Sequence, residues 1–208
     1  LYYAGYCRKK LGDGEGALAC FEKAEKTDSS YCFPNTIMDR LVLEDCLADL
    51  PLAPMANYYL GILLYDQREY GKSRDCFIRT TEQRPGFPTA HRNLALYAYN
   101  KQHDADTALR QMKTAFQLDQ KDARVLMELD QLQKKCNVPL HERLALLEAH
   151  EDLARSRDDL YTEYITLVNL NGGLEKALSL IQNHKFHPWE GGEGKITAQY
   201  IFSLFRMA

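Results

Sequence analysis

Apolar side chains recur along almost the whole chain at the period of an α-helix. Most segments place them at positions i, i+3, i+4 and i+7, and clusters of Gly, Asn, Asp or Pro separate one segment from the next. The alternation of period two that marks a half-buried strand is hard to find. The pattern therefore predicts an all-α protein.

Some of these helical segments repeat. Residues 58–77 and 91–112 can be laid over one another, which aligns Gly61 with Ala95. Two further stretches show the same order of small residue, turn and second helix, although less closely: residues 2–24 and 163–184. A repeat period of about 34 residues predicts helix hairpins that stack on one another.

Each repeat has a small residue in its first helix and a large one in its second. A small side chain lets two helix axes approach toward the short end of the roughly 8–10 Å range. We expect this at three positions: Gly5, Gly61 and Ala95. We expect the large residues to fill the space between successive helix pairs: Phe21, Phe77 and Met112. Phe77 and Met112 are one residue further apart in the sequence than Gly61 and Ala95.

A unit of this length with Leu-Gly in its first helix, Ala then Phe in its second and a proline such as Pro85 at its end resembles the tetratricopeptide repeat (TPR). The resemblance implies an α-solenoid of antiparallel helix pairs, an irregular TPR superhelix of about a dozen helices, over a single domain 1–208. Because the chain opens with Leu1 inside an apolar helical pattern and closes in another, we interpret it as a piece of a longer protein.

The segments between the repeats are less regular. Residues 36–50 predict an extra helix, with Asn35 as its N-cap. Residues 123–153 predict a further helix pair with its turn at residues 137–139, although its register stays open.

Composition narrows the range of functions. Lys and Arg total 26 against 29 for Asp and Glu, a net charge of −3 with no basic block, which argues against nucleic-acid binding. No apolar run is long enough for a membrane span, so we expect no membrane contact. The six cysteines include no Cys-x-x-Cys pair, and we predict reduced thiols in a cytoplasmic protein.

The TPR resemblance also implies a binding groove, because the first helices of successive TPR repeats line one face. Transferring the groove positions to the two clearest repeats predicts a site for a protein or peptide partner, or for another domain of the same chain: Tyr58, Tyr65, Asp66, Arg92, Tyr99 and Asn100. Tyrosine and arginine are favoured interface anchors. The alternative is that these tyrosines, among 13 in the chain, pack between helices with their hydroxyls in water.

Catalytic patterns are missing. The chain has no phosphate loop and no Gly-x-Ser-x-Gly, and Asp158 with Asp159 reads as acids at a helix start. His184, His187 and Glu190 are three residues apart, a spacing that could bring three metal ligands together on a helix. Pro188 argues against a continuous helix through them. We predict no catalytic residue, no metal and no cofactor.

The loop "FHPWEGGEG", residues 186–194, contains the only tryptophan of the chain. Either Trp189 tucks against neighbouring helices, with glycines forming a tight connection, or it forms a surface patch with Glu190 and Glu193 for a sugar or another domain. Both interpretations stay open.

A second resemblance covers nearly the whole chain. The strings "NHKFHPWEGGEGKITAQY", "RDDLYTEY" and "FPNTIMDRLVLEDCLADLP" resemble the helical C-terminal region of large bacterial YphG-type TPR proteins, which carry a β-rich N-terminal domain of unknown function. We therefore predict a non-catalytic protein-interaction or intramolecular docking scaffold. The alternative is a helical accessory domain that completes the site of a carbohydrate-processing enzyme, with residues 187–194 facing the neighbouring domain.

Overall fold

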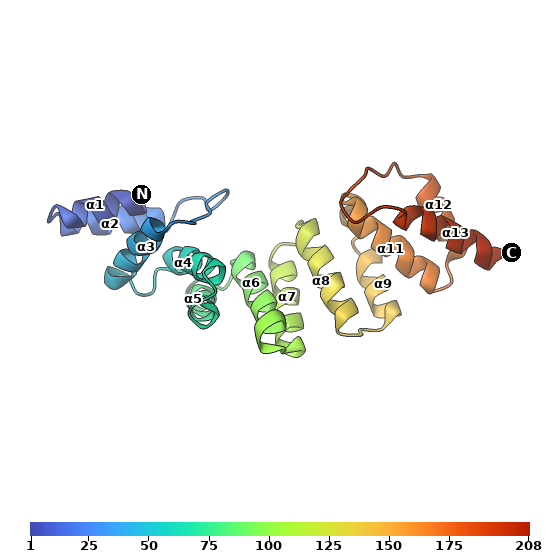
Figure 1. Cartoon of the computed structure of the whole chain (residues 1–208), viewed down its shortest axis with the longest axis horizontal. Coiled ribbons are helices and arrows are strands. Elements are labelled where there is room, and N and C mark those ends of the chain that lie inside the picture. Colours follow the sequence, from blue (N-terminus) through green and yellow to red (C-terminus); the bar gives the residue numbers. More distant parts are fainter. The chain divides into compact units, whose positions relative to one another are not determined.

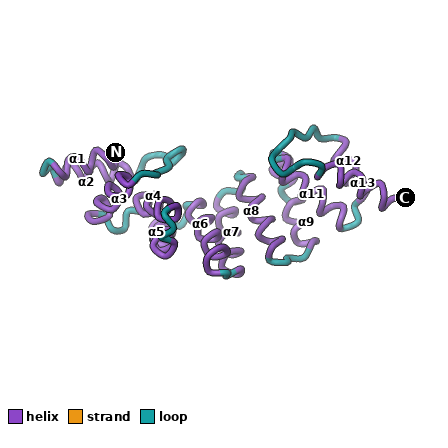
Figure 2. Tube along the Cα trace, viewed as in Figure 1, coloured by secondary structure: helices purple, strands orange, loops and turns teal.

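The computed structural model describes all 208 residues, Leu1–Ala208, and consists of helices and loops without a strand (Figures 1 and 2). It contains thirteen α-helices and one π-helical turn, which confirms the all-α prediction. Contacts divide the chain into two compact units, Leu1–Leu118 and Asp119–Ala208, and each is described by itself. Our expectation of one domain over residues 1–208 stays a prediction.

The first unit contains three helix hairpins and one additional helix. α1 packs against α2, α4 against α5 and α6 against α7, while α3 contacts both α1 and α4 (Figure 1). These helices are α1 (Tyr2–Lys10), α2 (Gly14–Ala24), α3 (Ile37–Asp49), α4 (Pro54–Asp66), α5 (Tyr70–Gln83), α6 (Pro88–Tyr97), the π-helical turn η1 (Ala98–Gln102) and α7 (Ala105–Leu118). The three repeats and the extra helix after the first repeat are confirmed.

Glycines in the first helices of two hairpins permit the close approach that their spacing predicts. A Cβ atom at Gly61 would lie 2.7 Å from Cε1 of Phe77, and one at Gly5 would overlap the ring of Phe21. The two rings therefore fill the inside of their own hairpins, which differs from the expected position between successive pairs. Phe77 also borders a pocket beside α6, the first helix of the next repeat.

Helix α3 begins one residue later than predicted, because its cap is Thr36 and not Asn35. The Thr36 hydroxyl accepts the N–H of Asp39 at 3.0 Å, and the Asp39 carboxylate accepts the N–H of Thr36 at 2.9 Å. This reciprocal pair is a capping box. The Asn35 N–H also donates to Asp39, but the N-cap is Thr36. The prediction of Asn35 as N-cap is therefore wrong.

The π-helical turn η1 accounts for the one-residue difference between the two clearest repeats. The N–H of His103 donates to the carbonyl of Ala98, five residues earlier, so this turn contains one more residue than an α-helical turn. Positions in the first helices of the two repeats keep the same spacing up to Ala95. Beyond η1, equivalent positions in the second helices are one residue further apart. His103 closes the turn with a left-handed backbone, φ 57°.

The second unit contains six helices and a long loop before the last of them. They are α8 (Ala123–Lys135), α9 (Leu140–Glu148), α10 (Glu151–Arg155), α11 (Asp158–Leu170), α12 (Leu174–Gln182) and α13 (Lys195–Met207). α11 is the central helix, contacting α9, α10, α12 and α13. The predicted turn at residues 137–139 is confirmed, with Asn137 in the left-handed region and Pro139 directly before α9. No helix in the chain is both long and apolar enough to cross a bilayer.

A buried ion pair joins the first helices of this unit. The Arg143 guanidinium donates to both carboxylate oxygens of Asp130, at 3.0 and 2.9 Å, and also to Glu163 at 2.9 Å. Burial raises the pKa of the Asp130 carboxyl, and the bidentate contact with Arg143 opposes that rise. Arg143 therefore ties α8 and α9 to α11.

Candidate functional site

A small, mostly apolar pocket lies between the first helices of the two clearest repeats. Its volume is about 180 Å³, and α4, α5 and α6 contribute its walls: Ile62, Tyr65, Phe77, Asn93 and Leu96. The Phe77 ring is buried against Gly61, while the residues from α4 and α6 are half-buried. The pocket is thus open at the surface and closed at its base.

The repeat period explains why these helices meet in a pocket. Ile62 and Leu96 directly follow Gly61 and Ala95, the aligned small residues at the helix contacts. They therefore occupy the same position in successive repeats. Our sequence reasoning selected Tyr65 but missed the apolar pair and Asn93. Comparing the two repeats position by position would have revealed Ile62 and Leu96.

One polar side chain of α6 lines this pocket, and a second polar side chain of α6 contacts the first. Asn93 lines it, and its amide oxygen accepts a 3.4 Å contact from Nη1 of Arg92. A pocket of this kind can hold one apolar side chain and offer donors to the polar groups beside it.

An aromatic contact links the rim of the pocket to η1. The Tyr65 ring meets the Tyr70 ring edge-on, with centroids 5.1 Å apart, and Lys101 Nζ lies 3.7 Å from the centroid of Tyr70. Cation–π contacts of this geometry are attractive. The end of α4, the start of α5 and η1 are therefore held together beside the pocket.

The other predicted groove residues lie in different settings. Tyr58 is only 8% exposed, because its ring packs edge-on against Phe87, at 4.8 Å between centroids. Burial raises the pKa of the Tyr58 hydroxyl, although the charge of Arg92 opposes this. Tyr58 thus fits the packing alternative. Asp66 is exposed at the end of α4. Tyr99 and Asn100 lie in η1, where Tyr99 is half-buried and Asn100 is exposed.

The Trp189 loop combines features of both interpretations. A Cβ atom at Gly192 would overlap the indole ring of Trp189, so only glycine permits the ring to lie there. The ring is half-buried, while Glu190 and Glu193 are exposed. Gly194 takes a left-handed φ of 72° directly before α13. The glycines therefore form the tight connection that one interpretation predicts, and the two carboxylates face solvent as the other requires.

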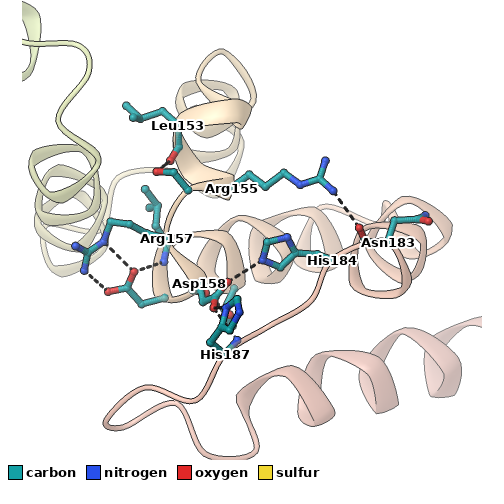
Figure 3. Close-up of polar contacts among 11 residues, drawn as sticks. Leu153, Arg155, Arg157, Asp158, Asn183, His184 and His187 are labelled. Carbon is teal, nitrogen blue, oxygen red and sulfur yellow. Dashed lines mark hydrogen bonds and ion pairs between the residues drawn. The ribbon is translucent and has the colours of Figure 1, made fainter.

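Asp158 anchors the start of this loop to α11 (Figure 3). Its carboxylate binds Nε2 of His184 at 2.7 Å and both Nδ1 and the backbone N–H of His187, at 3.1 and 2.7 Å. Burial works against ionisation, but these hydrogen bonds prevail and lower the pKa of Asp158. His184 is further enclosed by the rings of Tyr161 and Phe186, with centroids 4.7 and 4.5 Å away.

The same region confirms the predicted helix start. Asp158 and Asp159 lie in the first turn of α11, and Arg157 donates to both carboxylate oxygens of Asp159, at 3.1 and 2.7 Å. In this arrangement the histidines face Asp158, while Glu190 is not part of the cluster. No group of three or more His, Cys, Asp or Glu side chains is placed to hold a metal ion.

The comparison with solved structures decides the fold. No protein-family model matches the chain. YrrB, described as a TPR protein with an unusual peptide-binding site, is 15% identical with a TM-score of 0.55, over 98% of this chain and 88% of YrrB. The chain has the TPR fold. A MamA structure, at 11% identity, gives a TM-score of 0.56 over 99% of this chain and 92% of its own.

A chain from a structure of several proteins is also similar in fold. The structure of Naa15/Naa10 bound to HypK-THB gives a TM-score of 0.53 at 10% identity, over 99% of this chain and 33% of the matched chain. At these identities the similarity establishes the architecture of stacked helix pairs alone.

Proposed function

We propose that this chain is a non-catalytic scaffold that binds a protein or peptide partner through the pocket between α4 and α6. The observation that carries the proposal is the pocket itself, in which equivalent positions of two TPR repeats, Ile62 and Leu96, present an apolar surface beside Tyr65 and Asn93. YrrB, a protein of the same fold, is described as having a peptide-binding site, which supports the proposal.

The chemistry of the pocket defines the kind of segment that it would bind. One apolar side chain fits a volume of about 180 Å³, and the NH2 group of Asn93 can donate to a backbone carbonyl of an extended segment. Arg92, Tyr99, Asp66 and Asn100 lie on the same two helices or on η1 and would contact flanking residues of the partner. We further propose that this scaffold works in the cytoplasm.

Panning the intact chain against a random peptide library displayed on phage tests the proposal. Selected peptides should share an apolar residue, and Tyr65→Ala and Asn93→Ala should each weaken their binding about tenfold. The urea midpoint should change little. Ile78→Ala, an exposed apolar residue on α5 outside the pocket, is the matched control. Equal losses in all three variants, or no selected peptide, would refute the proposal.

Docking against another domain and the alternative of a helical accessory domain of an enzyme both stay predictions. The resemblance to YphG-type proteins supports a role beside a β-rich domain, and exposed Glu190 and Glu193 are accessible to such a neighbour. If the loop completes a carbohydrate-processing site, then changing both residues to glutamine in the full-length protein should abolish turnover of its sugar substrate. Unchanged turnover would rule the alternative out.

A further inference from the structure

A second hollow lies in the first unit, away from the pocket of the proposed scaffold function. It has a volume of about 340 Å³ and is formed by the start of α1, the loop between α2 and α3, and residues of α3 and α4. Aromatic rings and a single carboxylate dominate its lining: Tyr2, Tyr3, Tyr31, Phe33, Tyr59 and Asp39. No lysine or arginine side chain lines it.

The rings of this hollow differ in exposure: Tyr3, Tyr31 and Phe33 are exposed, whereas Tyr59 is buried. Tyr31 is 94% exposed and Phe33 is 72% exposed, which is unusual for such apolar side chains. Elsewhere in the chain, tyrosine rings are covered by lysines, as with Lys10 over Tyr6 at 4.8 Å. The hollow therefore offers exposed aromatic side chains to an external ligand.

Carboxylates increase the negative character of these rings. The Tyr3 hydroxyl donates to Asp39 at 2.8 Å, and the Tyr2 hydroxyl donates to Glu25 at 2.6 Å. A phenol that donates to a carboxylate has a more electron-rich ring, which strengthens its attraction for a cation. Burial works against ionisation of Asp39, but hydrogen bonds from Thr36 and Asn35 lower its pKa, so the carboxylate stays charged at neutral pH.

The hydrogen bonds of Asp39 also indicate which kind of cation fits. Oδ2 accepts three hydrogen bonds, from Asn35 N and from the N–H and hydroxyl of Thr36, and Oδ1 accepts one from Tyr3. Little acceptor capacity remains for a primary ammonium, which needs partners for three N–H donors when it leaves water. A quaternary ammonium has no N–H donors and is recognised by aromatic faces.

We propose that this hollow binds a small quaternary ammonium compound of the size of choline. The trimethylammonium head lies against the aromatic rings, and the fixed charge of Asp39 complements it without a direct hydrogen bond. The volume is at the small end of the range for sites that take small molecules. A hollow of this volume can hold the whole of a choline-sized molecule, so we take a free compound as the ligand rather than a methylated side chain of another protein.

Calorimetric titration of the intact chain with choline tests this site. Binding should saturate in the millimolar range, and the neutral isostere 3,3-dimethylbutan-1-ol should bind at least about tenfold more weakly. Tyr31→Leu and Phe33→Leu should each weaken choline binding about fivefold while the fold survives, because both side chains are exposed. Tyr200→Leu, on α13 of the other unit, should change nothing.

Cysteine labelling gives an independent readout. Cys32 lines the hollow, whereas Cys7 is also exposed but does not line it. Choline should slow the reaction of Cys32 with a thiol reagent and leave that of Cys7 unchanged. Three results would overturn the proposal: no saturable binding of choline, equal affinity for the neutral isostere, or tighter binding of a trimethyl-lysine peptide than of choline.

Discussion

The carboxylate of Glu25 caps helix α4 from a distant position in the sequence, and removing it should destabilise the first unit. Glu25 directly follows α2, and its oxygens accept the N–H groups of Met55 at 2.7 Å and Ala56 at 2.9 Å. It also accepts the hydroxyl of Tyr2. The N-cap of α4 itself, Ala53, has no side chain that could accept these donors. Glu25→Ala therefore leaves two backbone donors at a helix start without a partner.

Burial determines how much this substitution should cost. Met55 and Ala56 are both 0% exposed, so water cannot easily replace the carboxylate. A buried donor without a partner costs about 1–3 kcal/mol, and the lost charge at the positive end of the helix adds a few tenths to about 1 kcal/mol. We expect Glu25→Ala to lower the free energy of unfolding by about 3 kcal/mol. Glu25→Gln keeps one acceptor oxygen but sets its NH2 group against the other backbone N–H, so it should lose about 2 kcal/mol.

Urea unfolding followed by far-ultraviolet circular dichroism measures the effect, with the slope of the transition checked for constancy. Glu22→Ala is the matched control, because Glu22 is an exposed glutamate on α2 that changes the net charge equally. Its midpoint should hardly move. If both alanine variants shift the midpoint equally, the loss reflects charge or helix propensity, and the capping argument fails.

Two further predictions concern the second unit. Arg143→Met should lower its stability by about 3–5 kcal/mol, because it leaves the carboxylate of Asp130 buried without its guanidinium; a double variant with Asp130→Leu should recover much of that loss in the same urea assay. The contribution of Asp158 should depend on pH. Its folded pKa is lowered, so its stabilisation is present above the unfolded value of about 3.9 and is lost as the pH falls through the folded pKa. The stability difference between native protein and Asp158→Asn, measured by denaturant titration from neutral to acidic pH, should therefore narrow at the acidic end, and a constant difference would contradict the assignment.

The hairpins could be predicted because small residues and turns recur at a fixed spacing. Gly61 and Ala95 lie where two helices touch, and a steric requirement of this kind is visible in the sequence alone. The cap of α4 could not be predicted in the same way. Glu25 and Met55 are 30 residues apart, and only the packing of α2 against the following helices brings them together. Contacts between elements of different repeats leave no local pattern.

The groove was harder to read because α4 is buried on almost every side. Nine of its thirteen residues are buried, so no single apolar stripe distinguishes its packed face from its open face. The family pattern therefore predicts Tyr58 in the groove, whereas packing places its ring in the core. The period of apolar residues locates the exposed face of a helix only where the helix has a clearly exposed face.

The turn η1 limits how far the repeat period can be used. Tyr65 and Tyr99 are separated by one repeat, as Gly61 and Ala95 are, and would take equivalent positions if both first helices were regular. Tyr99 lies in the π-helical turn, where the extra residue rotates the side chains that follow relative to an α-helix. Equivalence therefore holds for Ile62 and Leu96, which precede the turn, and fails for residues within it. This explains why the pocket contains the earlier pair but not Tyr99.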